Sequence, residues 1–93
     1  MGRNKTQAHK NPQAYINDLI DLSIVLTRLR ERAEISQDEL SVMAGVEKYT
    51  ISNIENASGS PTLKTVSKIF DALDYSVADA YAEIEAYRIR YDG

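Results

Sequence analysis

The sequence predicts an all-α protein, a compact bundle of about five helices with a further helical extension at its C-terminus. Apolar residues recur at steps of three and four along most of the chain, which is the period of an amphipathic helix. Signals that start and stop helices separate these periodic stretches. At 93 residues the chain has room for one domain and one hydrophobic core.

Composition excludes several classes of protein. The chain has no cysteine, so disulfides, thiolate metal sites and cysteine nucleophiles are absent. Its N-terminus is polar, and no apolar stretch is long enough to span a bilayer. The single histidine, His9, stands apart from other metal-binding or catalytic residue types. We therefore expect a cytoplasmic protein, stabilised by packing, with no membrane contact, metal or cofactor.

The net charge of −3 is unusual for a protein that binds phosphates, but the charges are unevenly distributed. Residues 1–70 hold nine basic side chains and eight acidic ones, whereas residues 71–93 hold six acidic side chains against Arg88 and Arg90. A mildly positive face can therefore exist on the first seventy residues.

The first two parts of the chain differ in pattern. Residues 1–11 are polar and basic without periodicity, which predicts a flexible arm. From Pro12 the pattern is helical, with an apolar stripe at Ile16, Leu19, Leu22, Leu26 and Leu29. One long helix and a short helix followed by a longer one from Leu22 both fit this stripe.

A capping box marks the next helix. The Ser36 hydroxyl can accept from the Glu39 amide while the Glu39 carboxylate reaches back, so a helix starts at Gln37. Its expected buried face is Leu40, Met43 and Ala44. Gly45 ends it, because glycine accepts the left-handed conformation of a sharp turn. A third helix follows from about Lys48 to Asn56, with inner residues Val46, Ile51 and Ile54.

Two more helices complete the bundle. Pro61 fits the first helical position after a Ser60 cap, and the inner face of that helix is Leu63, Val66, Ile69, Phe70 and Leu73. Ser76 can cap a fifth helix, in which the apolar register is Val77, Ala80, Tyr81, Ile84, Tyr87 and Tyr91. The alternation of residues 87–91 also has the period of a strand.

The unit from Ser36 to Asn56 is a short helix, a glycine turn and a second short helix, which is an arrangement that places a helix in the major groove. The outer side of the second helix is a polar stripe made of Tyr49, Ser52, Asn53 and Asn56. Such groups can match the donors and acceptors on base edges. Taken alone, the stripe is more typical of a solvated helix face.

The reading of this polar stripe as a DNA-binding surface is supported by a family resemblance. The chain resembles the Cro and lambda-repressor-like helix-turn-helix family in the segments 35–40, 44–46, 50–56, 61–63 and 69–73. The resemblance implies a lambda-repressor-like bundle, binding of double-stranded DNA as a homodimer, and a recognition helix at residues 48–56. We expect base contacts from Lys48, Tyr49, Ser52 and Asn53, and phosphate contacts from Gln37, Thr50, Asn56 and Lys64.

The resemblance also assigns a structural role to two charges. In the family, the positions of Arg30 and Glu55 often form an ion pair that holds the first helix to the recognition helix; the alternative is two unrelated surface charges. The chain departs from the family at Glu47, where serine or threonine is usual. It departs again at residues 57–60, where a glycine and basic residues are usual. Both departures weaken phosphate attraction.

The expected organisation is a basic arm (residues 1–11), a helix-turn-helix domain (12–76) and a dimerisation extension (77–93). The dimer surface is expected at Tyr81, Ile84, Tyr87 and Tyr91, because large rings near a chain end often seek a partner. The leading hypothesis is a repressor or autoregulator that binds an inverted repeat. The alternatives are an antitoxin that binds a toxin protein and represses its own operon, and an interaction module without DNA binding. No cluster of catalytic groups favours an enzyme.

Overall fold

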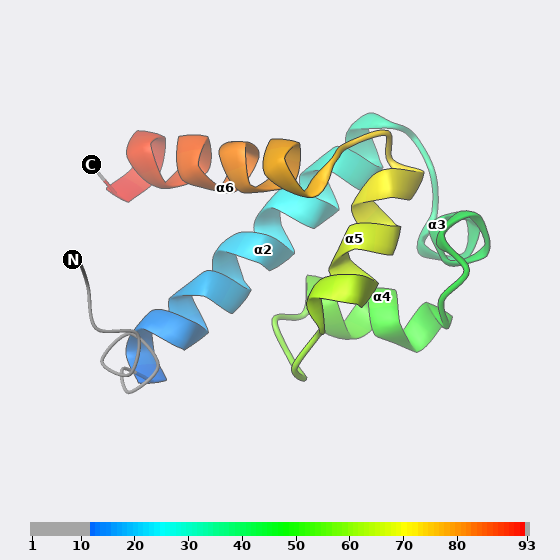
Figure 1. Ribbon diagram of the computed structural model, residues 1–93, viewed down its shortest axis with the longest axis horizontal. Helices are drawn as coiled ribbons and strands as arrows, with labels where there is room; N and C mark the ends of the chain where they lie inside the picture. Colours follow the sequence, from blue (N-terminus) through cyan, green and yellow to red (C-terminus); the bar gives the residue numbers. More distant parts are fainter. Residues whose placement is uncertain (1–11, 93) are drawn as a thin grey trace.

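The computed structural model describes the backbone of residues 12–92 and the side chains of residues 18–90. This part of the chain contains helices and no strand (Figure 1), which confirms the all-α prediction. The helices are α2 (Pro12–Arg32), α3 (Gln37–Ala44), α4 (Lys48–Glu55), α5 (Leu63–Ala72) and α6 (Val77–Asp92). The arm predicted for residues 1–11 lies outside the described residues.

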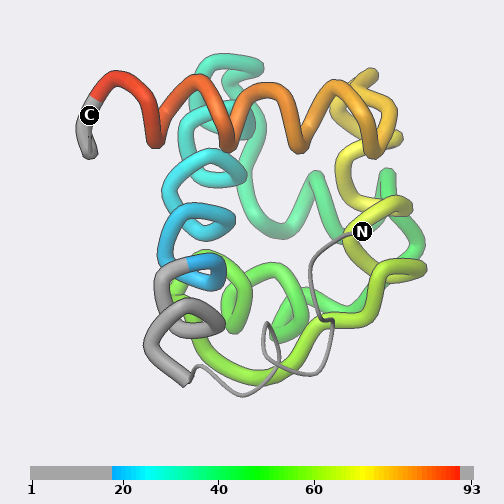
Figure 2. The backbone as a smooth tube through the Cα atoms, turned by 60° about the vertical axis from the view of Figure 1, so that its left-hand side comes forward, coloured from blue at the N-terminus to red at the C-terminus, as the bar shows by residue number. Residues whose placement is uncertain are grey.

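The central element is α2, which is a single helix of 21 residues. Figure 2 shows it as one continuous coil, with α6 lying against it. Of the two alternatives that the sequence allowed, the single long helix is the one observed. Its C-terminal half supplies Val25, Leu26 and Leu29 to the core.

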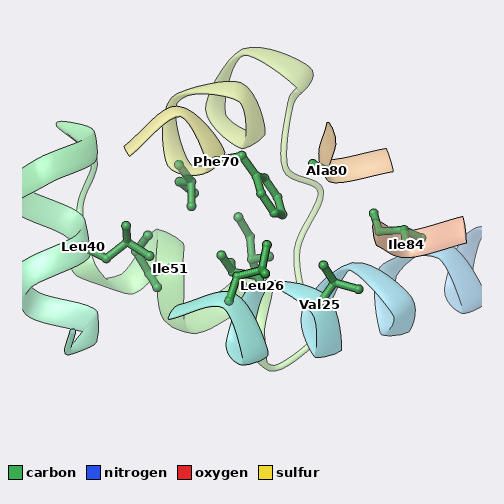
Figure 3. Packing of buried hydrophobic residues seen from close by; sticks show 10 residues of the cluster. Val25, Leu26, Leu40, Ile51, Phe70, Ala80 and Ile84 are labelled. Atoms are coloured by element: carbon green, nitrogen blue, oxygen red, sulfur yellow. The ribbon is translucent and has the colours of Figure 1, made fainter. Parts of the chain in front are cut away.

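All five helices of the described part of the chain contribute residues to one hydrophobic core. Figure 3 shows Leu26, Leu40, Ile51 and Phe70 pointing toward one another. The buried set is Val25, Leu26, Leu29, Leu40, Ile51, Ile54, Ile69, Phe70, Ala80 and Ile84. Several other predicted core residues are half-buried against it, namely Ala44, Val46, Val66 and Leu73.

One predicted core position in α3 is wrong. Met43 is 55% exposed, and Ser41 is buried in its place. Helix α3 packs on its neighbours through the side that carries Leu40, Ser41 and Ala44, and Met43 lies outside that side. The buried serine is tolerated because its Oγ donates to the Asp38 carbonyl at 2.7 Å.

The predicted start of α5 is also wrong. The N-cap is Thr62 and not Ser60, because the Thr62 Oγ1 accepts from the Thr65 backbone N–H at 3.2 Å. Pro61 therefore precedes the cap, and Leu63 is the first helical residue. Leu63 is 60% exposed, so it does not belong to the closed core.

The last helix, α6, continues to Asp92, so the strand alternative for residues 87–91 is wrong. Its predicted cap is present: the Ser76 Oγ accepts from the Asp79 N–H at 3.0 Å, and an Asp79 carboxylate oxygen accepts from the Ser76 N–H at 3.2 Å. Near its other end, Arg88 donates from Nε to Asp21 of α2 at 2.6 Å and also contacts Asp18. These bonds tie α6 to α2.

Candidate nucleic-acid interface

The short helices α3 and α4 are joined by a tight turn whose geometry comes from local residues. The Ser36 Oγ accepts from the Glu39 N–H at 3.0 Å, and Glu39 accepts from the Ser36 N–H at 2.7 Å, so the predicted capping box is present. Gly45 adopts the left-handed conformation with φ 70°, and its N–H donates to the Ser41 carbonyl at 2.9 Å. Glu47 is the N-cap of α4, but its side chain makes no capping hydrogen bond.

A bidentate ion pair holds α4 to α2. Arg30 donates from Nε and Nη2 to the two carboxylate oxygens of Glu55, at 2.6 Å and 3.0 Å. The two side chains are only 13% and 6% exposed. The hydrogen bond to Glu55 raises the pKa of Arg30 against the opposing effect of burial, so the guanidinium stays charged. The pair predicted from the resemblance is present, and the alternative of two separate surface charges is excluded.

The same network reaches α3. The Gln37 Nε2 donates to the Glu55 Oε1 at 2.9 Å, and the Arg30 Nη1 donates to the Ile35 carbonyl at 2.8 Å. Glu55 at the end of α4 therefore accepts hydrogen bonds from Arg30 of α2 and from Gln37 at the start of α3. Because one carboxylate contacts both helices, it helps to hold α3 and α4 in place relative to α2.

The outer side of α4 carries the predicted polar stripe. Tyr49 is 67% exposed, and Asn53 and Asn56 are also exposed, whereas Ser52 is half-buried. Asn56 Nδ2 lies 3.5 Å from the Ser52 Oγ, at the limit of a hydrogen bond. The stripe is thus continuous along the described helix, and it presents hydroxyl and amide groups that can both donate and accept hydrogen bonds.

The remaining predicted contact residues lie around this stripe. Lys48 is exposed and pairs with Asp38 of α3 at 3.3 Å, a partner that the sequence reasoning did not identify. Because both side chains are more than half exposed, this pair adds little stability and can exchange for another anion. Lys64 is exposed at the start of α5, and Thr50 is half-buried on α4.

A hollow of about 200 Å³ lies between the end of α4 and the start of α5. Several hydroxyl groups that the sequence reasoning missed border it together with Thr50 and Asn53, namely Ser58, Ser60, Thr62 and Thr65. The signal that could have found them is the density of serine and threonine between residues 58 and 65. Hydroxyls of this kind can donate to phosphate oxygens.

The residues predicted for dimerisation do not share one exposed surface. Tyr81 is 57% exposed, but Ile84 is buried in the core at 8%, so it is not available to a partner. Tyr87 is half-buried, and the Arg28 guanidinium lies 5.3 Å above its ring. The side chain of Tyr91 lies outside the described residues.

Among residues 12–92, every helix is too short or too polar to cross a bilayer. No group of three or more metal-binding side chains occurs in the described part of the chain.

Comparison with known proteins agrees with this geometry. A protein-family model described as helix-turn-helix matches residues 26–79. No curated protein and no solved structure matches the chain. The matched residues make up more than half of the chain and include α3, the glycine turn, α4 and α5. The chain therefore belongs to the helix-turn-helix family of the Cro and C1 type, a family of DNA-binding regulators.

Proposed function

We propose that this chain represses transcription by binding an inverted repeat of double-stranded DNA as a dimer, with α4 of each copy in the major groove. The observation that carries the proposal is the contrast between the two sides of α4. One side is fixed to α2 by the buried pair of Arg30 and Glu55, and the other presents exposed Tyr49 and Asn53. A rigid helix with exposed hydrogen-bonding groups is suited to reading base edges.

The outward residues divide by chemistry. Asn53 can form a two-pronged contact with adenine, and Lys48 can donate to guanine when it leaves Asp38. Tyr49 can pack on a thymine methyl, and Ser52 can add a single hydrogen bond. These four residues are the proposed sequence readers.

The proposed phosphate contacts surround the readers. Gln37 uses one amide hydrogen on Glu55, and the second hydrogen of the same group is suited to a phosphate. Thr50, Asn56 and Lys64 flank the stripe and can donate to the DNA backbone in the same way. Since only two of the eight proposed contact residues are lysines, binding depends less on salt than it does in strongly basic repressors.

Selection of bound duplexes from a random pool tests the proposal. The wild-type chain should enrich an inverted repeat whose half-sites lie about one helical turn apart, roughly 34 Å. The control is the double variant Tyr49→Ala/Asn53→Ala, which changes two exposed side chains and leaves the core intact. It should enrich no defined sequence. Identical enrichment by both proteins would contradict the assignment of α4 as the reading helix.

A second candidate is an antitoxin that binds a toxin and represses its own operon. The observation that favours it is the acidic C-terminal part, where exposed Asp79 and Glu85 lie on the same helix as exposed Tyr81 and Ile89. A basic partner protein with an apolar patch would fit such a helix. Sedimentation of the chain mixed with the purified product of the adjacent gene tests this candidate: a stable complex supports it, and independent sedimentation rejects it.

A further inference from the structure

An ion pair connects the first turns of α3 and α4 at one end of the polar stripe. Lys48 is the first residue of α4, and its Nζ lies 3.3 Å from the Oδ1 of Asp38, the second residue of α3. The backbone under Asp38 is fixed, because the capping box of Ser36 and Glu39 starts α3 and Leu40 is fully buried. A proposed base reader is therefore paired with a carboxylate whose backbone position the fold defines.

This pair is too exposed to matter for stability. The Lys48 side chain is 57% exposed and the Asp38 side chain is 71% exposed, and pairs of this kind contribute little to folding. Because water reaches both charges, the contact can open and the ammonium can move to another acceptor. The pair is therefore suited to competition for Lys48 and not to holding α3 against α4.

Asp38 also lies beside a proposed phosphate contact. It follows Gln37 in the first turn of α3, the end of the helix that the proposed complex turns toward the DNA backbone. A carboxylate at this place repels phosphate unless a cation stays next to it. A move of Lys48 to a phosphate therefore leaves the carboxylate of Asp38 unpaired beside a negative charge.

A base edge makes a different demand on Lys48. Guanine O6 and N7 are two neutral acceptors in the major groove, and a lysine ammonium has three donors, so one lysine can serve both. The cost of opening the pair with Asp38 is then offset by two directed hydrogen bonds. The other bases lack this pair of acceptors, so they offset less of that cost.

We infer that Asp38 is a positioning residue that sets the sequence specificity of Lys48, because it competes with DNA phosphates for the ammonium and releases it to guanine. The inference rests on the proposed function, in which α4 lies in the major groove. Without such a partner, a lysine on its flexible stem is a point charge that binds any phosphate within reach. Asp38 thus lowers the affinity for arbitrary DNA more than the affinity for the preferred site.

A purely structural role for Asp38 predicts a different result. Asp38 and Glu39 both place negative charge in the first turn of α3, where the helix dipole favours it. If this were the whole role of Asp38, its removal would loosen α3 and weaken binding to every duplex. Competition for Lys48 predicts the opposite sign, which is tighter binding to DNA that lacks the preferred sequence.

The affinities of the wild-type chain and of Asp38→Asn for a selected and a scrambled duplex test the inference. Asparagine keeps the shape of the side chain and removes its charge. Asp38→Asn should bind the scrambled duplex about five- to tenfold more tightly in about 0.1 M salt, because one lysine per copy becomes available to a phosphate. Its salt slope on that duplex should be steeper by about 1 per copy. On the selected duplex the gain should be less than about twofold, so the ratio of the two affinities should fall.

The matched control is Asp71→Asn. Asp71 is exposed in the last turn of α5, the end that leads to α6 (Figure 1), and its substitution makes the same change of charge. It should leave the ratio of the two affinities at the wild-type value. A second comparison uses Lys48→Met, which removes the ammonium and keeps an unbranched side chain. In that background Asp38→Asn should no longer change the ratio, as a double-mutant cycle requires of a residue that acts through Lys48.

Two results would overturn the inference. One is an Asp38→Asn chain that discriminates between the duplexes as well as the wild type does, and the other is a loss of discrimination that persists without Lys48. Either result can occur while the wild-type chain still prefers the selected duplex, which leaves the proposed function intact. A wild-type chain without any preference would reject the proposed function itself and the inference that rests on it.

Discussion

The helix-turn-helix and the C-terminal helix are attached to α2 in different ways. Arg30 and Glu55 join α2 to α4 through side chains that are 13% and 6% exposed, while the outer side of α4 is polar. Arg88 joins α6 to α2 with its side chain 35% exposed, and exposed apolar residues remain on α6. Helix α4 is thus held in place by a buried ion pair, and its solvent-facing side is polar. Helix α6 instead keeps the apolar side chains Tyr81 and Ile89 exposed to water.

The largest difference in unfolding free energy should appear when one charged side chain is removed from each of the two ion pairs, Arg30 with Glu55 and Arg88 with Asp21. Glu55→Ala leaves Arg30 buried without its carboxylate and removes the acceptor of Gln37, so it should cost about 3–5 kcal/mol of unfolding free energy. Arg88→Ala removes a partly solvated guanidinium but leaves the Asp21 carboxylate, 11% exposed, without that partner, so it should cost about 1–3 kcal/mol. Urea denaturation of both variants measures the difference. Equal losses would show that the two attachments are equivalent.

The second contrast lies within α3, where a buried and an exposed side chain are three residues apart. Leu40 is fully buried, so Leu40→Ala should cost about 2–5 kcal/mol. Met43 is 55% exposed, and Met43→Ala should change stability by no more than about 0.5 kcal/mol. The midpoints of thermal unfolding should show this order. A larger loss for Met43→Ala would contradict the orientation of α3.

The smallest expected effect concerns Ala57, the second residue after the end of α4. Ala57 has φ 56°, a left-handed conformation that is unfavourable for a residue with a Cβ atom. Ala57→Gly should therefore stabilise the chain by up to about 1 kcal/mol. Asp74, with φ 69°, is the control, because aspartate tolerates this conformation better than alanine and Asp74→Gly should gain less. A destabilising Ala57→Gly would mean that the alanine methyl has a packing role there.

Local signals in the sequence were sufficient for much of the fold. The capping box at Ser36 and the turn at Gly45 depend on neighbouring residues, so they could be predicted directly. The core positions in the middle of helices, such as Leu26 and Ile51, follow from periodicity because a helix interior has a defined buried side.

The errors lie at helix ends and on faces that need tertiary information. Leu63 has the correct period for the core, but it is the first residue of α5, where it borders a groove and not the closed interior. Ser60 and Thr62 are both good caps, and sequence alone does not choose between them. Tyr81 and Ile84 belong to the same apolar register, yet only the packing of α6 on α2 separates the exposed residue from the buried one.

The sequence predicted which residues of α3 and α4 form the candidate DNA-binding surface, but it did not predict the contacts among them. The polar stripe on α4 follows from helical spacing, and the ion pair of Arg30 with Glu55 came from the family resemblance. The bond from Gln37 to Glu55 and the pair of Lys48 with Asp38 depend on how α3 and α4 cross, which spacing does not define. A substitution of Gln37 would therefore disturb its bond to Glu55 as well as any phosphate contact. A substitution of exposed Lys64 is a cleaner test of phosphate binding.

The central claim is that the exposed side of α4 reads bases, and the affinity of Asn53→Ala for selected and scrambled duplexes tests it most directly. Asn53 is exposed and outside the core, so the substitution leaves folding unchanged. It should lose about 1–3 kcal/mol per half-site on the selected duplex and little on the scrambled one. Lys64→Ala, the control, should weaken both duplexes similarly and reduce the salt slope by about 2 per dimer. Equal losses on both duplexes for Asn53→Ala would contradict the account.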